Sequence, residues 1–129
     1  MPVEPIPGLA PNVGHMPLEA IKAARGEPPW SVRLIETERM WANLHCQAPG
    51  QGNREHYHET DEWWVVLEGE LEWSLGGQDY FRARQGDIVF AAKNVSHHIR
   101  VVGDKPALRL AVGMPGHPHI YEGPNIPSR

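Results

Sequence analysis

Residues 50–69 carry the strongest structural signal in this chain and read Gly-Gln-Gly-Asn-Arg-Glu-His-Tyr-His-Glu-Thr-Asp-Glu-Trp-Trp-Val-Val-Leu-Glu-Gly. His56 and His58 are two residues apart, so on a β-strand both side chains lie on one face. Glu62 follows four residues later and returns to that face if the strand continues or resumes after a short turn. Two imidazoles and a carboxylate on one side of a sheet can ligate a divalent metal ion. The alternative is a polar strand with surface histidines, but a third histidine downstream favours the metal site.

The third histidine ends a second segment, residues 86–97, which reads Gly-Asp-Ile-Val-Phe-Ala-Ala-Lys-Asn-Val-Ser-His. Together the two segments resemble the two motifs of the cupin family. The first motif, Gly-x5-His-x-His-x3-Glu-x6-Gly, is matched at every fixed position, namely Gly50, His56, His58, Glu62 and Gly69. The second, Gly-x5-Pro-x-Gly-x2-His-x3-Asn, is matched at its first glycine and its histidine, which are Gly86 and His97.

The second motif departs from the family pattern at three positions. Ala92, Asn94 and Val101 stand where the motif has proline, glycine and asparagine. Asn94 is a tolerable replacement because asparagine enters the left-handed backbone region that glycine otherwise serves. Ala92 removes a rigid turn but no ligand.

The resemblance covers about residues 30–115 and implies an all-β fold. It implies a double-stranded β-helix, a jelly-roll-like cupin barrel, preceded by a short N-terminal helix. It also implies one metal ion bound by four side chains, those of His56, His58, Glu62 and His97.

Within the cupins, the run from His56 to Gly69 is similar to 3-hydroxyanthranilate 3,4-dioxygenases, which bind iron(II) through two histidines and a glutamate and open an aromatic ring. Their first ligand histidine matches His58 better, so His56 is either a fourth ligand or a spare. Val101 stands where those enzymes place a substrate-binding arginine, and Arg100 has the wrong parity. The resemblance therefore implies an oxygenase-like pocket and leaves the substrate open.

Length and composition set limits on what the chain can be. A chain of 129 residues forms one domain with a single core. The net charge of −4 and the scattered basic residues predict no nucleic-acid partner. A single cysteine, Cys46, excludes an internal disulfide and fits a reducing compartment. Without a signal peptide or an apolar run of membrane length, we expect a cytoplasmic protein that does not bind membranes.

Proline and glycine divide the chain into three parts. Residues 1–29 are predicted to form a proline-rich arm and a short helix, Leu18–Arg25, which ends at Gly26. Residues 30–115 form the predicted barrel, and residues 116–129 a loop-like tail. No proline occurs between residues 50 and 105, as expected for the body of a sheet. The predicted strands span 31–36, 39–47, 54–58, 62–68, 70–75, 78–83, 87–91, 97–102 and 107–112.

The predicted ligands leave coordination positions free. Four ligands on an octahedral ion leave two adjacent positions for a bidentate substrate, or for substrate and dioxygen. A divalent ion with one carboxylate has a formal charge of +1 and favours an anionic, chelating ligand. Iron(II) is the expected ion, and manganese, nickel, cobalt and zinc are chemically admissible; four protein ligands could also satisfy zinc without an open position.

Several other side chains are candidates for the walls of the pocket. Arg54 has the parity of His56 and is predicted either to hold a substrate carboxylate at the barrel mouth or to pair with a nearby acid. Trp64 and Val66 share the parity of Glu62 and are expected to line an apolar cavity. His45 and Cys46 are adjacent, so one of them faces the interior; which one is left open, and Cys46 is expected to be a small core residue.

The remaining histidines are expected to be peripheral. His98 follows His97 and points to the opposite face. His117 and His119 are expected in a solvated tail, unless the tail folds over the barrel mouth.

Three classes of function fit these features. The first is a mononuclear metal dioxygenase that acts on a small anionic or aromatic compound. The second is a metal-dependent isomerase, decarboxylase or lyase, and the third is a non-catalytic small-molecule binder. A homodimer is expected from the proline-rich arm and from five tryptophans, which so small a chain cannot all bury.

Overall fold

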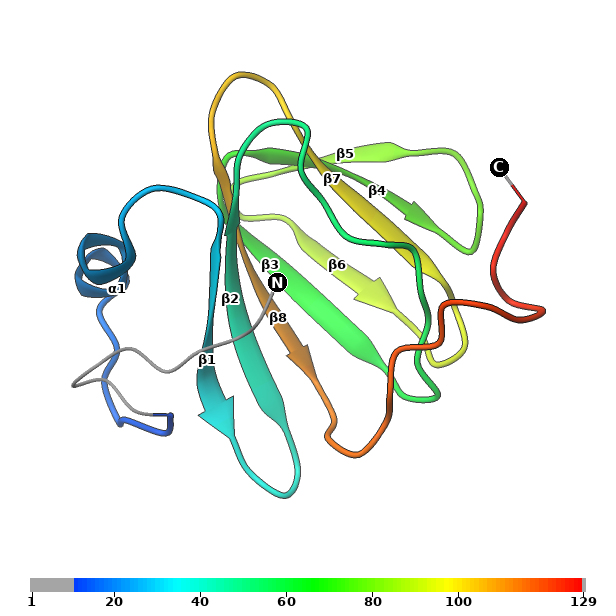
Figure 1. The fold of residues 1–129 in the computed structure, drawn as a ribbon, viewed down its shortest axis with the longest axis horizontal. Helices are drawn as coiled ribbons and strands as arrows, with labels where there is room; N and C mark the ends of the chain where they lie inside the picture. The colour runs from blue at the N-terminus through cyan, green and yellow to red at the C-terminus, as the bar shows by residue number, and fades with distance from the viewer. Residues whose placement is uncertain (1–10, 129) are drawn as a thin grey trace.

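The computed structural model describes residues 11–128, so the first ten residues of the predicted arm lie outside the described part. These described residues form one helix and eight strands (Figure 1). In order they are α1 (Leu18–Arg25), β1 (Trp30–Glu36), β2 (Trp41–Gln47), β3 (Glu62–Glu68), β4 (Glu70–Leu75), β5 (Phe81–Arg84), β6 (Ile88–Ala91), β7 (His97–Val102) and β8 (Ala107–Gly113). Within residues 11–128, no helix has the length and apolar character needed to cross a bilayer.

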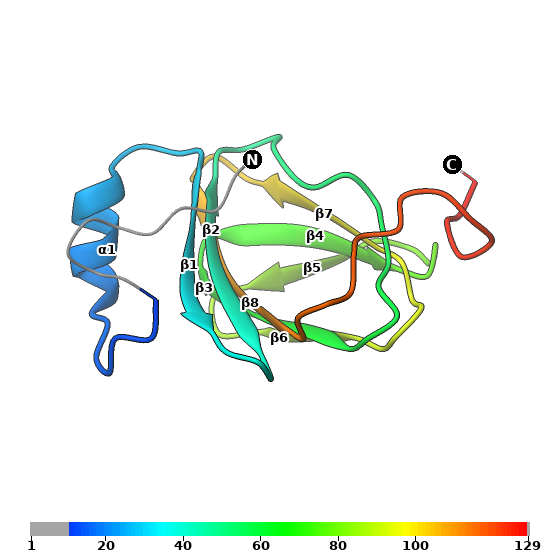
Figure 2. The same cartoon turned by 60° about the horizontal axis from the view of Figure 1, so that its bottom comes forward.

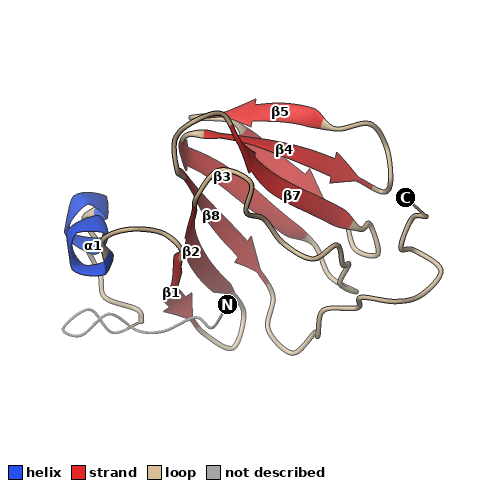
Figure 3. Ribbon diagram, turned by 45° about the horizontal axis from the view of Figure 1, so that its top comes forward, coloured by secondary structure: helices blue, strands red, loops and turns tan. Residues whose placement is uncertain are grey.

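The strands form two antiparallel sheets that face each other (Figure 3). The larger sheet has the strand order β1-β2-β8-β3-β6, and the smaller has the order β5-β4-β7. Gly69 alone separates β3 from β4, so the chain crosses from one sheet to the other at this residue. This arrangement confirms the predicted all-β barrel with one short helix.

The predicted strand at residues 54–58 is wrong. This segment is extended but forms only isolated bridges, from His56 to His97 and from Tyr57 to Ile120. Consecutive residues therefore bond to different neighbours, β7 for His56 and the C-terminal tail for Tyr57, so neither neighbour builds a continuous ladder with the segment. The helix Leu18–Arg25 has the predicted bounds.

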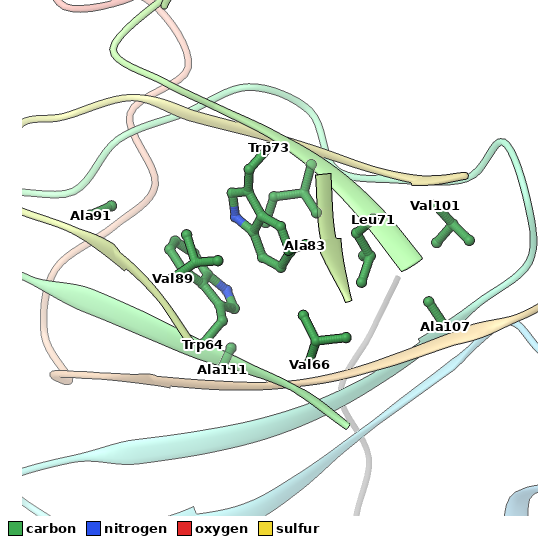
Figure 4. Close-up of a cluster of buried hydrophobic side chains, with 11 residues drawn as sticks. Trp64, Val66, Leu71, Trp73, Ala83, Val89, Ala91, Val101, Ala107 and Ala111 are labelled. Atoms are coloured by element: carbon green, nitrogen blue, oxygen red, sulfur yellow. The ribbon is translucent and has the colours of Figure 1, made fainter. Parts of the chain in front are cut away.

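The main core lies between the two sheets. Trp64 on β3 and Trp73 on β4 are both buried, and their ring centroids are 5.7 Å apart. Figure 4 shows these two rings among the small aliphatic side chains of the same cluster. Val66 belongs to this cluster. We expected Val66 to line the ligand cavity, and it packs in the core instead.

A second core lies on the outer face of β1 and β2, against α1 (Figure 2). Ile21 of the helix packs in one cluster with Leu44 and Cys46 of β2. Because side chains alternate along a strand, the residues between them point into the barrel. Of the two adjacent residues His45 and Cys46, it is therefore His45 that faces the barrel interior, where it lines a cavity. Cys46 is a buried core residue on the outer side of the sheet, as expected.

The loop before β7 confirms the expectation for Asn94. Its φ angle of 68° lies in the left-handed region, as the replacement of the motif glycine predicted. The backbone N–H of Asn94 donates to the carbonyl oxygen of His58 at 2.7 Å. The loop between β6 and β7 therefore holds the segment that carries the histidines.

Candidate metal centre

Four side chains from three parts of the chain meet at one end of the barrel. His56 and His58 lie on the extended segment, Glu62 begins β3 and His97 begins β7. All four are buried. Two backbone hydrogen bonds between His56 and His97 join the segment to β7. These bonds bring the two histidines of the segment close to His97, although they are distant in the sequence.

The ligand atoms are close enough to share one ion. One nitrogen or oxygen from each of the four side chains lies within 4.8 Å of all the others. Nε2 of His58 is 2.8 Å from Oε1 of Glu62, and Nε2 of His97 is 3.0 Å from Nε2 of His56. Metal–nitrogen and metal–oxygen bonds of about 2.0–2.2 Å allow two adjacent ligand atoms of one ion to lie as close together as these two pairs do.

Two of these atoms lack a hydrogen-bond partner. Although Nε2 of His58 and Oε1 of Glu62 are near each other, they do not meet the geometry of a hydrogen bond, and no other described atom satisfies them. Buried polar atoms without partners are costly, and a cation between them would satisfy both. The residues present therefore fit a divalent metal ion.

A hydrogen bond orients one of the imidazoles. Nδ1 of His56 lies 2.7 Å from the carbonyl oxygen of Arg54, which can only accept, so Nδ1 carries the proton and donates. In a neutral imidazole this leaves the lone pair on Nε2, the atom that faces His97. Such a contact behind a ligand fixes its tautomer and its ring orientation.

Burial keeps the imidazoles unprotonated. It lowers the pKa of His56 to about 3 and that of His97 to about 2, with neighbouring imidazoles adding to the effect. The hydrogen bond to the Arg54 carbonyl acts in the opposite direction on His56 but is outweighed. Both rings are neutral at physiological pH, which is the state that binds a metal.

These pKa values predict how the metal-free protein responds to acid. The unfolded chain, with histidine pKa values of about 6.5, binds more protons than the folded chain between that pH and about pH 3. The contribution of the two neutral imidazoles to the free energy of unfolding is therefore fully present above pH 6.5. It is lost as the pH is lowered, by up to about 1.4 kcal/mol per pH unit for each of His56 and His97.

Urea unfolding of the metal-free protein at several pH values measures this slope. His56→Gln should reduce it. An unfolding free energy that stays constant between pH 6.5 and 4 would contradict the prediction.

A cavity of about 640 Å³ opens beside the four residues. Trp64 lies in its wall, as predicted, but much of the rest is polar. The polar side chains come from the inner face of the larger sheet and include Ser31, Asn43, His45, Gln47 and Arg109. One wall of the cavity is thus polar, where an apolar cavity was expected.

The C-terminal tail folds over the mouth of this cavity. Tyr57 and Ile120 exchange two backbone hydrogen bonds, which brings the tail beside the histidine segment (Figure 1). The ring of His119 then stacks on His56, with centroids 4.0 Å apart and planes 10° from parallel. Of the two alternatives for the tail, the structure has the one in which it folds over the barrel mouth: His117 and His119 both border the cavity, and both keep an exposed side. No local pattern signals this contact.

Arg54 lies at the mouth, on the wall of the cavity. Its guanidinium carbon is 4.5 Å from the centre of the Tyr121 ring, a cation–π contact with the tail. Its side chain is exposed. The role predicted for Arg54 in substrate binding stays a prediction.

Arg109 is a further residue of the cavity, and it was not predicted from the sequence. Its side chain is only 5% exposed and points from β8 into the cavity. Burial lowers the pKa of Arg109 to about 10, and Glu62 partly opposes this, so the guanidinium remains charged at neutral pH. An arginine flanked by leucines, as in the Ala-Leu-Arg-Leu-Ala run of β8, was the available signal.

Two facing antiparallel sheets with three histidines and a glutamate buried at one end define a double-stranded β-helix protein with a candidate metal centre. Residues 43–113 match the Cupin domain family, and the chain belongs to that family. This confirms the family resemblance seen in the two motifs.

Solved structures share this fold. TT1209 from Thermus thermophilus is 29% identical, with a TM-score of 0.70 over 80% of this chain and 98% of that one. A conserved protein of Klebsiella pneumoniae with a double-stranded β-helix domain is 21% identical, with a TM-score of 0.71 over 86% of this chain and 100% of that one. KdgF from Halomonas sp. is 23% identical, with a TM-score of 0.62 over 70% of this chain and 83% of that one. No curated protein matches this chain in sequence.

Proposed function

We propose that this protein is a mononuclear metal-dependent enzyme that acts on a small organic anion. The observation that carries the proposal is the buried set of three histidines and one glutamate, with ligand atoms within 4.8 Å of one another, beside a cavity of about 640 Å³. A site built only for structure would need no cavity next to it.

His56, His58, Glu62 and His97 would hold one divalent ion. Such an ion supplies a Lewis acid for a carbonyl or enolate oxygen or, if it is iron(II), a centre that can activate dioxygen. The chain supplies the surroundings: Trp64 covers one side of the site, and the tail residues His119 and Tyr121 lie at the mouth, where they limit access of water.

Two kinds of reaction are candidates. An iron(II) dioxygenase is the first, and it rests on the resemblance of the histidine segment to ring-opening dioxygenases. A redox-neutral reaction, by an isomerase, decarboxylase or lyase, is the second. The hydrophilic wall formed by side chains such as Asn43 and Gln47 favours this second candidate, because it suits an oxygen-rich substrate better than a flat apolar ring.

Metal content and oxygen consumption test the proposal. Protein purified without added metal is analysed for bound metal, then supplied with small hydroxy acids, keto acids and catechols while oxygen uptake and product formation are followed. We expect one divalent ion per chain. Full turnover without oxygen would eliminate the dioxygenase and leave the redox-neutral class, and a chain that takes up no divalent ion would overturn the whole proposal.

Arg54 is proposed to contact the anionic substrate at the mouth. Charge-assisted hydrogen bonds contribute about 1.5–3 kcal/mol. Because Arg54 is exposed, we expect the free energy lost in Arg54→Ala to lie at the low end of this range. The apparent substrate affinity should then fall about tenfold. Metal content should stay unchanged, since Arg54 is not a ligand.

Substrate titration of the Arg54 variant beside Arg100→Ala measures the effect. Arg100 is exposed on β7, where it pairs with Glu72, and serves as the control. Equal affinity of the Arg54 variant and the control would remove Arg54 from the site.

A homodimer is proposed from an exposed apolar surface. Trp63, Ile88 and Phe90 lie on the neighbouring strands β3 and β6 and are 40%, 70% and 55% exposed. β6 is also the end strand of its sheet, so no strand within residues 11–128 pairs with its outer edge, and such an edge can pair with another chain.

Sedimentation at micromolar concentration should show a dimer for the wild-type protein, and Phe90→Lys should convert it to monomer. A wild-type monomer under these conditions would contradict the prediction. Glu59→Lys, an exposed change outside the apolar surface, is the matched control.

A further inference from the structure

Arg109 is a buried cation that has an unused donor. Its Nη1 donates to Oε1 of Gln47 at 2.6 Å, while its buried Nε has no hydrogen-bond partner. Within residues 11–128, no carboxylate forms an ion pair with this guanidinium, although other arginine and lysine side chains in that part of the chain do pair with carboxylates. A buried charge of this kind is expensive unless something else binds it.

The surroundings of Arg109 form a continuous polar wall. Arg109 is paired across the sheet with His45, which in turn is paired with Ser31. The Ser31 hydroxyl lies 2.6 Å from Nδ1 of His45. Asn43 and Gln47 flank His45 on the same face of β2 and also border the cavity.

In this wall, polar side chains occupy the barrel interior, where apolar side chains usually pack. On β2 the apolar side chains Leu44 and Cys46 pack outward under α1, and the polar ones point inward. Apolar residues on the inner face would pack more stably, so the inward polar side chains, and the charged one above all, point to a ligand.

The position and shape of the guanidinium indicate what that ligand is. The candidate metal centre would have a formal charge of +1, and Arg109 adds another positive charge in the same cavity. A guanidinium binds a carboxylate through two parallel N–H donors. The free Nε–H belongs to the edge of Arg109 that the contact with Gln47 leaves open.

We propose that Arg109, held in place by Gln47, binds the carboxylate of the substrate inside the barrel. The substrate is then an oxygen-rich organic acid whose hydroxyl or keto groups contact the polar side chains of β1 and β2. Another oxygen of the same molecule reaches the metal centre, and this last contact rests on the proposed function. Arg54, at the mouth, then contacts another oxygen of the same bound substrate, on the side that faces the entrance.

The test uses three oxygen-rich acids, gluconate, glucuronate and tartrate, with glucose as the neutral control and benzoate as the apolar anion. Binding to the full chain is measured by calorimetry, and the side-chain Nε–H signal of Arg109 is followed by NMR. We expect at least one of the three acids to bind and to shift that signal, while glucose and benzoate do not. Arg109→Met should weaken the binding at least tenfold without changing metal content.

Thermal unfolding separates a binding role from a structural one. Because the buried charge costs stability, Arg109→Met should melt no lower than the wild-type protein without ligand. Arg109→Lys should recover part of the affinity, and Arg100→Gln, on the surface of the other sheet, should bind like the wild type.

Three results would overturn the inference: acid binding by Arg109→Met that equals the wild type, no binding of any of the three acids at millimolar concentration, or benzoate binding more tightly than all of them. If Arg109→Met fails to fold, the Nε–H signal of Arg109 in the wild-type protein still tests the inference, because an acid that binds without shifting this signal does not contact Arg109. Failure of the proposed function looks different, because the wild-type chain would then bind no metal while the Arg109 signal still responds to the acids.

Discussion

Replacing Glu62 by alanine is expected to abolish the uptake of a divalent metal ion. Glu62 is the only anionic side chain in the set of four, and its Oε1 lies 2.8 Å from His58 and 3.6 Å from His97. Without it, three neutral imidazoles remain and the ion keeps its full charge in a buried site. His58→Ala should have the same result, because it removes a ligand that the structure leaves without another partner.

The loss should also be visible in stability. A ligand at one hundred times its dissociation constant stabilises the folded state by about 2.7 kcal/mol. Added metal should therefore raise the melting temperature of the wild-type protein but not that of the Glu62 and His58 variants. Elemental analysis gives the stoichiometry in parallel.

Glu59→Ala is the matched control, since Glu59 is an exposed glutamate three residues away. Unchanged metal stoichiometry in both the Glu62 and the His58 variant would refute the site. His56→Ala answers the remaining question: retention of the metal would show a centre with three ligands and His56 as a spare.

The second large effect is expected for Gly69→Ala, on folding. Gly69 has a φ angle of 79°, and a Cβ atom there would lie 2.6 Å from the carbonyl oxygen of Pro106 and 2.8 Å from Cα of Ala107. The left-handed conformation alone costs a non-glycine residue about 1–2 kcal/mol. The clash with backbone atoms adds a cost of roughly 1–3 kcal/mol for forced repacking. We expect a loss of about 2–5 kcal/mol, a large part of the roughly 5–15 kcal/mol typical of a small domain.

Gly50→Ala separates these two contributions. Gly50 has a similar φ angle of 85°, but a Cβ atom there would meet nothing within 4 Å. Urea unfolding should therefore show a small loss for Gly50→Ala and a much larger one for Gly69→Ala. Equal losses would mean that the close approach of β8 to Gly69 contributes nothing.

The candidate metal centre could be predicted because its signals are local. The alternation of His56 and His58, the return at Glu62 and the turn chemistry around His97 each depend on a few neighbouring residues. The same holds for the helix Leu18–Arg25, which has a glycine and prolines directly after it. Short-range spacing and turn preferences survive whatever the rest of the chain does.

The pocket around the centre could not be predicted in this way. Alternation shows that His45 and Cys46 face opposite sides, but only the packing of α1 on β2 shows which side is the interior. The same packing turns Arg109 inward, where the sequence shows no more than an arginine between leucines.

Contacts between distant segments were equally hidden. The bonds between Tyr57 and Ile120, which bring His119 onto His56, join residues more than sixty positions apart. Gly69 appears in the sequence only as a turn residue, and its need to lack a side chain arises from the start of β8 beside it. The sequence by itself thus determined the residues of the candidate metal centre and the position of most strands along the chain, because those follow from neighbouring residues. The tertiary structure decided the polarity of the cavity wall, the position of the C-terminal tail over its mouth and the inward orientation of Arg109. Each of these depends on which surfaces distant segments bury against one another.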